Sequence, residues 1–287
     1  MSGPENSVPP AISAGPHAVG GDAPLLLLAG PCVVEDRDMI LHTAETVRRV
    51  SDRLEMPAVF KSSFKKANRT SIDAFTGLGR EEALRILEEV RSQFGLALVT
   101  DVHDVDDVRE AASVVDILQI PAFLSRQTDL LLAAGETGRA VNIKKGQFLA
   151  PGDMRHAADK VASTGNTDIM LCERGTSFGY HDLVVDMRGL VQMRALGYPV
   201  VMDCTHAVQI PSLGGTSGGR PEFIFPLARA AAAVGIDALF VETHPDPSRA
   251  RSDAGSQLPL SMLESLLTQV RDVDAVRRSY QSTQAIP

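Results

Sequence analysis

Short apolar runs recur along the chain, separated by segments of mixed polarity. Eight runs follow one another at intervals of about thirty residues, the size of one strand–helix–strand unit. They are apolar throughout rather than alternating, as expected of parallel strands that are covered on both faces. The runs are PLLLLAG (24–30), PAVFKSSF (57–64), LALVTDV (96–102), DILQIPAF (116–123), AVNIKKG (140–146), DIMLCERG (168–175), PVVMDCTH (199–206) and ALFVETHP (238–245).

Helical periodicity appears between these runs. Apolar residues recur there at helical intervals, and four of the five clearest segments stop at a glycine, a common residue just after a helix. The expected helices are 80–95, 153–165, 182–197, 226–235 and 258–276.

Eight strand–helix units in about 260 residues predict a (β/α)8 TIM barrel in the α/β class. An open, doubly wound sheet is the alternative, although no glycine-rich G-x-G-x-x-G turn follows any strand. Residues 1–23 are rich in Pro, Gly, Ser and Ala without periodicity, and we expect a flexible N-terminal extension there. The catalytic domain is then a single barrel over 24–280, followed by a tail at 281–287.

Composition and net charge limit the kinds of partner that we expect the protein to bind. A net charge of -8 argues against general attraction to nucleic acid or to an anionic membrane, so an anion-binding patch has to be local. The leucine run at 25–28 is too short to span a bilayer and has no preceding basic residues, as a secretory signal would. Three cysteines are too few for a disulfide framework and fit a reducing, cytoplasmic location.

Polar groups end every predicted strand. Active sites of such barrels lie at the carboxyl ends of the strands, so this set is the first candidate for a reaction centre. Exposed strand ends carry some charges in any soluble barrel, which is the alternative explanation. The residues are Cys32, Lys61, Asp101, Gln119, Lys144, Arg174, His206 and Glu242.

One group among the candidates is cationic. Phosphates and carboxylates require several fixed donors, and Arg and Lys supply them with different geometries. In an acidic protein, cations gathered at one rim predict a small, multiply anionic substrate, whereas Lys65 and Lys145 also fit solvated surface positions. The cations are Lys61, Lys66, Arg69, Arg126, Lys144 and Arg174, with neutral donors at Ser63, Asn68, Thr70 and Ser71.

A second group has the chemistry of a metal site. Cys32, His206 and Glu242 end the first, seventh and eighth strands, which become neighbours when the barrel closes, and Asp253 follows the eighth. A thiolate, an imidazole and two carboxylates form a ligand set for a divalent transition metal. A strand-end cysteine is also often a small buried hydrophobe, and we assign Cys172 and Cys204 to that role.

The motifs together resemble those of the 3-deoxy-manno-octulosonate 8-phosphate synthase family, over residues 25–270. The resemblance implies a (β/α)8 homotetramer that condenses phosphoenolpyruvate with arabinose 5-phosphate and water and releases inorganic phosphate, for the lipopolysaccharide core. The related heptulosonate synthases, which use erythrose 4-phosphate, are the alternative. Their basic motif typically reads K-P-R-T-S, where this chain has KANRTS (66–71). The motifs here are AGPCVVE, FKSSFKKANRTS, TDVH, IPAFLSRQTDL, NIKKGQF, CERGTSFGY, DCTHAVQ, GGTSGGR and FVETHPDPSRARSDAGSQLPL.

The resemblance also implies roles for individual residues. Cys32, where metal-independent members have Asn, points to the metal-dependent branch, with zinc, iron, manganese or cobalt as possible ions and no organic cofactor. Arg126 is expected to reach a neighbouring subunit, and GGTSGGR (214–220) to close over the site. Phosphoenolpyruvate is assigned to Lys61, Ser63, Lys66, Lys144, Gln147 and Arg174, the sugar phosphate to Asn68, Arg69, Thr70 and Ser71, supporting roles to Asp101, His103 and Gln119, and metal ligation to Cys32, His206, Glu242 and Asp253.

Two other functions remain open from the residues alone. A metal-dependent lyase acting on a sugar phosphate would use the same barrel, ion and cations. A non-catalytic sugar-phosphate sensor would tolerate the loss of metal ligands, and all four are present here.

Overall fold

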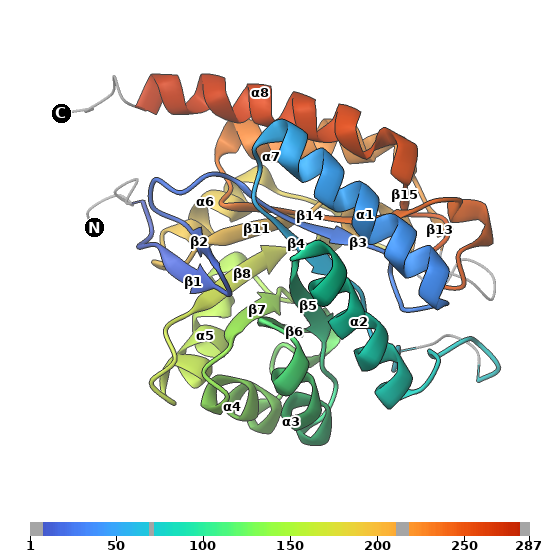
Figure 1. Cartoon of the computed structure of the whole chain (residues 1–287). Helices are drawn as coiled ribbons and strands as arrows, with labels where there is room; N and C mark the ends of the chain where they lie inside the picture. The colour runs from blue at the N-terminus through green and yellow to red at the C-terminus, as the bar shows by residue number, and fades with distance from the viewer. Residues whose placement is uncertain (1–7, 69–71, 211–217, 282–287) are drawn as a thin grey trace.

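A closed barrel of parallel strands forms the centre of the molecule (Figure 1). The structure is a computed structural model that describes residues 8–68, 72–210 and 218–281. The eight barrel strands are β3 (Leu26–Gly30), β4 (Ala58–Lys61), β5 (Ala97–Asp101), β6 (Ile117–Ile120), β7 (Ala140–Lys144), β8 (Ile169–Glu173), β11 (Val200–Asp203) and β14 (Ala238–His244).

Pairing of the first barrel strand with the last closes the sheet. Strand β14 pairs with β3 in parallel, with Glu242 opposite Gly30, and pairs with β11 on its other side. The remaining strands pair in chain order. This confirms the (β/α)8 barrel and excludes the open sheet.

Helices surround the barrel, and α1, α7 and α8 lie next to one another in Figure 1. Within the described residues, no helix combines the length and the apolar character needed to cross a membrane. The helices are α1 (Arg37–Leu54), α2 (Arg80–Phe94), α3 (Val105–Val114), α4 (Thr128–Glu136), α5 (Met154–Ala162), α6 (Met187–Arg194), α7 (Ile224–Val234) and α8 (Leu263–Gln281).

Local signals explain where these helices begin and end. Asp36 and Asp104 cap α1 and α3 by accepting the amide hydrogens of Met39 and Asp107. Helix α2 stops at Gly95, whose φ of 64° is left-handed, as the sequence predicts. The expected helix 182–197 is shorter: α6 begins after Asp186, because residues 183–184 form a strand instead.

Short strands and 3₁₀ turns occur within the loops between the barrel strands and the helices. The short strands are β9 (Thr176–Ser177), β10 (Leu183–Val184), β12 (Gln209–Ile210), β13 (Gly218–Gly219) and β15 (Leu258–Pro259). The 3₁₀ turns are Ala122–Leu124, Pro151–Asp153, His206–Val208, Pro221–Phe223, Pro247–Arg249 and Leu260–Met262.

Two apolar cores account for strands that are apolar on both faces. Leu26 and Leu28 of β3 pack inside the barrel with residues such as Phe240. Leu25 and Leu27 pack outward, in the layer between the strands and the helices. Every leucine of the run is therefore buried in one of the two cores.

The N-terminal segment differs in part from the expected extension. Residues Ile12–Ala14 (β1) and His17–Val19 (β2) form an antiparallel hairpin. Ala14 and Val19 are fully buried and belong to the interior core of the barrel, with Gly15 supplying the left-handed turn at φ 63°. The sequence pattern of this hairpin, a few apolar residues on either side of a two-residue turn, is too short for periodicity to distinguish it from a loop. The tail beyond residue 281 lies outside the described residues.

The hairpin gives a stability test. Substitution of Val19 by Asp places a charge without a partner in the apolar interior, and we expect the free energy of unfolding to fall by several (~3–5) kcal/mol. Urea denaturation measures the change. The matched control is Ala18→Asp, because Ala18 is the exposed neighbour on the same strand. Equal, small effects of the two substitutions would contradict the packing of this hairpin.

Candidate active site and metal centre

The predicted strand-end residues lie at the carboxyl rim of the barrel, which we define as the ends of the eight strands and the loops that follow them. Lys61, Asp101 and Lys144 are the last residues of β4, β5 and β7, whereas Gln119 lies one residue inside the end of β6. Cys32, Arg174 and His206 follow their strands within three residues, and Glu242 lies inside β14. All except the partly buried His206 are buried.

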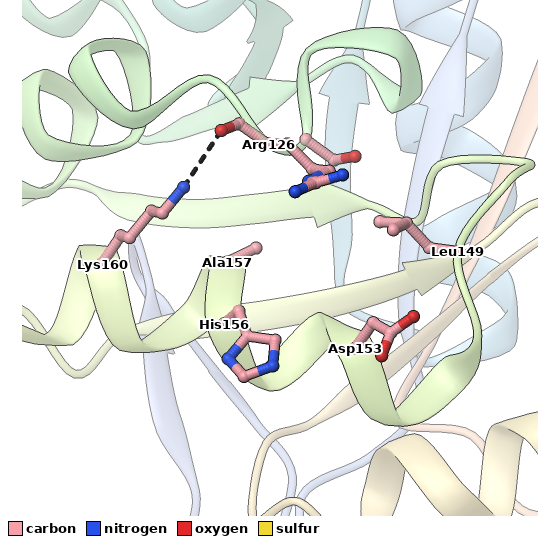
Figure 2. Close-up of a pocket in the computed structure, with 7 residues that line it drawn as sticks. Arg126, Leu149, Asp153, His156, Ala157 and Lys160 are labelled. Carbon is pink, nitrogen blue, oxygen red and sulfur yellow. Dashed lines mark hydrogen bonds between the residues drawn. The ribbon is translucent and has the colours of Figure 1, made fainter.

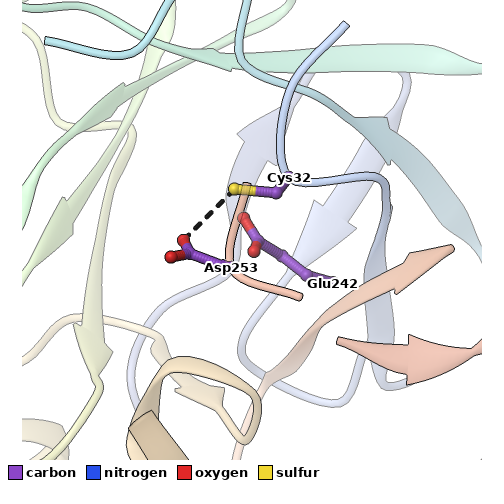
Figure 3. Close-up of side chains that lie close together, drawn as sticks. All are labelled: Cys32, Glu242 and Asp253. Carbon is purple, nitrogen blue, oxygen red and sulfur yellow. Dashed lines mark hydrogen bonds between the residues drawn. The ribbon is translucent and has the colours of Figure 1, made fainter. Parts of the chain in front are cut away.

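A thiol and two carboxylates meet where the barrel closes (Figure 3). Cys32 Sγ lies 3.2 Å from Asp253 Oδ2, and the ligand atoms of Cys32, Glu242 and Asp253 all lie within 4.8 Å of one another. Burial raises the pKa of the Cys32 thiol, and the carboxylates of Asp253 and Glu242 raise it further. A thiol in such surroundings ionises only with a cation beside it.

His206 lies beside this group. Its Nε2 is 3.6 Å from Glu242 Oε1 and 3.8 Å from Asp253 Oδ2, and its Nδ1 is 2.8 Å from Asp203 Oδ2. A carboxylate on one ring nitrogen leaves the other nitrogen available as a ligand, which is the usual arrangement of metal-binding histidines. The geometry therefore gathers three of the four predicted metal ligands, Cys32, Glu242 and Asp253, and places His206 beside the two carboxylates.

Asp203 is a site residue that the sequence analysis missed. It is the last residue of β11, fully buried, and its Oδ2 accepts a 2.6 Å hydrogen bond from Lys144 Nζ. Burial alone would raise its pKa, but His206 and Lys144 outweigh burial and hold that pKa well below its usual range. Its place at a strand end, three residues before His206, was the available signal.

The donor set fits a divalent cation. Glu242 ion-pairs with Lys61 through Oε1, whereas its buried Oε2 has no hydrogen-bond partner among the described residues. Although burial would raise the pKa of Glu242, His206 and Lys61 lower it to about 2. An ionised, half-satisfied carboxylate beside a thiol and an imidazole is suited to a transition metal such as zinc or iron.

A chain of polar side chains crosses the barrel beside this group. Asp101 contacts Ser63, Gln119 donates to Asp101 over 2.7 Å, and Asn142 donates to Gln119 over 2.9 Å. The Nζ atoms of Lys61 and Lys66 each lie 3.8 Å from Asp101 Oδ2. Asn142 is a second residue missed by the sequence analysis, since it lies within an otherwise apolar strand.

Unpaired donors and acceptors remain on the part of the rim that follows β7 and β8. Arg174 donates to Gln209 over 3.0 Å, but its buried Nη1 has no partner among the described residues. Gln147 Oε1 is buried without a partner in the same part of the chain. Lys145 is fully buried and donates to Thr176, so the solvated surface position considered for it is wrong. Its burial is possible because Glu173 lies 3.5 Å away and balances its charge. Open donors beside paired cations are what an anionic substrate requires.

Some predicted residues lie elsewhere. Arg126 is exposed and lines a separate cavity of about 450 Å³ together with Asp153 and His156 of the α5 region (Figure 2). Asn68 is exposed, and His103 contacts Asp107 rather than the metal group. Arg69, Thr70 and Ser71 lie outside the described residues, as do 214–217 of the glycine-rich segment, whose Gly218–Gly219 pair with Gln209–Ile210.

Comparison with known proteins gives consistent matches. Residues 10–278 match the model of the DAHP synthetase I family. The chain is 58% identical over 258 residues to the 2-dehydro-3-deoxyphosphooctonate aldolase of Syntrophotalea carbinolica, covering 90% of this chain and 93% of that protein. Identities to proteins of the same name are 52% in Trichlorobacter lovleyi (93% and 98% covered) and 54% in Stenotrophomonas maltophilia (91% and 95% covered).

Asp203 provides a test of the geometry around His206. The Asp203→Asn substitution removes the charge that orients both His206 and Lys144, and we expect affinity for Zn²⁺ to fall about 10–100-fold. Titration calorimetry measures the affinity. Asp129→Asn, at an exposed position of α4, is the control. An unchanged affinity in Asp203→Asn would show that Asp203 does not support a ligand.

Proposed function

The chain belongs to the DAHP synthetase I family and, by its relatives, to the 2-dehydro-3-deoxyphosphooctonate aldolases, and we propose that it condenses phosphoenolpyruvate with arabinose 5-phosphate and water. The products are 3-deoxy-D-manno-octulosonate 8-phosphate and inorganic phosphate, for the lipopolysaccharide core. The observation that carries this function is the identity of 58% to a protein of that name along 90% of the chain. The alternative sugar, erythrose 4-phosphate, is not favoured.

We propose that phosphoenolpyruvate binds where the rim is richest in buried cations. Lys61, Lys66 and Lys144 are each balanced by a carboxylate, and Arg174 adds a donor, Nη1, that has no partner in the part of the chain that the structure describes. The methylene carbon of phosphoenolpyruvate forms a bond to the sugar aldehyde carbon, water adds to the enol-phosphate carbon, and phosphate leaves by carbon–oxygen cleavage. Fixed cations stabilise the doubly phosphorylated intermediate without having to reorganise. Ser63 and Gln147 complete this part of the site.

The sugar phosphate is assigned to the segment that follows β4. Asn68 is exposed there, next to Arg69, Thr70 and Ser71 in sequence. Holding the two anionic substrates in contact contributes a large part of the rate enhancement of such a reaction, because a collision in solution is replaced by a fixed arrangement. Asp101, His103 and Gln119 are proposed to support the substrates from β5 and β6.

A divalent transition metal is proposed at Cys32, His206, Glu242 and Asp253. When bound, the ion supplies Lewis-acid chemistry and orientation to the substrate beside it. The protein contributes the four donors, the outer contact of Asp203 to His206, and the Oγ of Ser252, which lies 2.9 Å from Cys32 Sγ.

We further propose that the protein works as a homotetramer in the cytoplasm. Exposed Phe123 and Phe148 follow β6 and β7 near Arg126, and aromatic side chains of this kind are enriched at protein interfaces. A neighbouring subunit covering them would bring Arg126 toward a second site. The three cysteines are all free and buried, as suits a reducing compartment.

The substrate assignment is tested by assaying phosphate release from phosphoenolpyruvate with each sugar phosphate. We expect arabinose 5-phosphate to support turnover, and kcat/KM with erythrose 4-phosphate to be at least ~100-fold lower, because a site built for an extra hydroxyl leaves polar groups unpaired without it. Faster phosphate release with erythrose 4-phosphate would contradict the assignment.

The metal assignment is tested by Cys32→Ala. We expect this substitution to abolish stoichiometric Zn²⁺ binding and to lower activity by more than the ~10–100-fold typical of losing an outer partner of a ligand. Elemental analysis and the phosphate assay, before and after chelation and metal addition, give the two readouts. Cys204→Ala is the control, since that buried thiol lies outside the donor group. Full, chelator-resistant turnover in Cys32→Ala would refute the ligand role.

A further inference from the structure

Asp107 forms a buried junction outside the proposed metal and phosphoenolpyruvate sites. It lies in the first turn of α3, and its side chain is fully buried. Its Oδ1 accepts hydrogen bonds of 2.7 Å from both Lys65 Nζ and Arg80 Nη2. Its Oδ2 lies 3.0 Å from the backbone nitrogen and 3.2 Å from Nδ1 of His103. One carboxylate therefore joins three segments.

Two of these contacts mark the two ends of one loop. Lys65 directly precedes the KANRTS motif, and Arg80 is the first residue of α2. The two residues that flank the loop 66–79 therefore bind the same carboxylate. Within the loop, Lys66 donates its backbone hydrogen to Thr76 over 2.8 Å. Gly77 packs so closely that an added Cβ would lie 2.8 Å from the carbonyl oxygen of Phe64. The base of the loop is thus closed and tied to α3.

The third contact fixes a residue after β5. The carboxylate of Asp107 holds both the backbone and the ring of His103, and a proton on Nδ1 leaves the Nε2 lone pair available. Although burial would raise the pKa of Asp107, the hydrogen bonds from His103 and Lys65 and the charge of Lys65 lower it to about 2. The carboxylate of Asp107 is therefore ionised throughout the physiological pH range.

We propose that Asp107 is a positioning residue for the sugar phosphate, acting through the loop 66–79 that carries Asn68. This inference rests on the proposed function, because it takes Asn68 as a sugar-binding residue. Of the groups assigned to phosphoenolpyruvate, Lys66 lies in this loop, but its Nζ is held 3.8 Å from Asp101 Oδ2 rather than by Asp107. Loss of the junction should therefore affect the two substrates unequally.

The test is Asp107→Asn, which keeps the shape of the side chain but removes its charge. We expect KM for arabinose 5-phosphate to rise about tenfold, as for weakened hydrogen bonds to a charged group, while KM for phosphoenolpyruvate changes less than about twofold. Glu110→Gln is the matched control, because Glu110 is the exposed second partner of Arg80 and lies on the same helix. Its kinetics should equal those of the unmodified protein.

Further variants separate positioning from folding. Lys65→Met and Arg80→Met each remove one end of the clamp at partly exposed positions, and each should raise KM for the sugar phosphate even if Asp107→Asn folds poorly. A lower melting temperature with an unchanged ratio of the two KM values in all three variants would overturn the proposal. The role would then be confined to the stability of α3.

Hydrogen exchange makes the proposal independent of the enzymatic assignment. Peptides covering 66–79 should exchange faster in Asp107→Asn than in Glu110→Gln, whatever the substrate. If the unmodified protein fails to turn over arabinose 5-phosphate, the proposed function is wrong. If it turns over but exchange and KM values are unaffected by Asp107→Asn, only the positioning role is wrong.

Discussion

Pairing of β14 with β3 is the interaction on which the rest of the site depends. These strands lie more than two hundred residues apart in the chain, and their register sets Glu242 beside Gly30, two residues before Cys32. The loop after β14 then returns Asp253 to Cys32, and His206 follows β11, the strand on the other flank of β14. Backbone hydrogen bonds of a closed sheet thus assemble a donor group that no local sequence motif contains.

Charge balance is the second constraint on this site. Each buried lysine of the rim lies against a carboxylate: Lys61 with Glu242, Lys66 with Asp101, and Lys144 with Asp203. A buried charge is tolerated only when it is paired, so the cations needed for an anionic substrate require acids of equal number nearby. Such pairing allows a protein of net charge -8 to hold several cations close together at one rim. The attraction is local, and the carboxylates also orient the lysines.

The sequence predicted the barrel well because its strands are apolar on both faces, a pattern few other folds require. It also singled out Cys32, Glu242 and Asp253, whose ligand atoms lie within 4.8 Å of one another, and His206, which lies beside Glu242 and Asp253. It missed Asp203, Asn142 and Asp107, whose roles lie in their partners rather than in their spacing. Lys145 was ambiguous for the same reason: burial of a lysine depends on Glu173, a neighbour from another strand. The hairpin of residues 12–19 was hidden by its brevity.

The hairpin has a consequence for the chemistry at the opposite end of the barrel. Ala14 and Val19 join Leu26, Val99 and Phe240 in one apolar column inside the strands. Apolar side chains therefore close the amino end of the barrel. The charged residues of the rim have this region of low dielectric constant on one side and solvent on the other. Coulombic forces are strengthened in such an asymmetric dielectric, and field lines from the lysines are directed toward the open side. The hairpin ahead of the first barrel strand thereby strengthens the electric field that the rim lysines produce at the opposite end of the barrel.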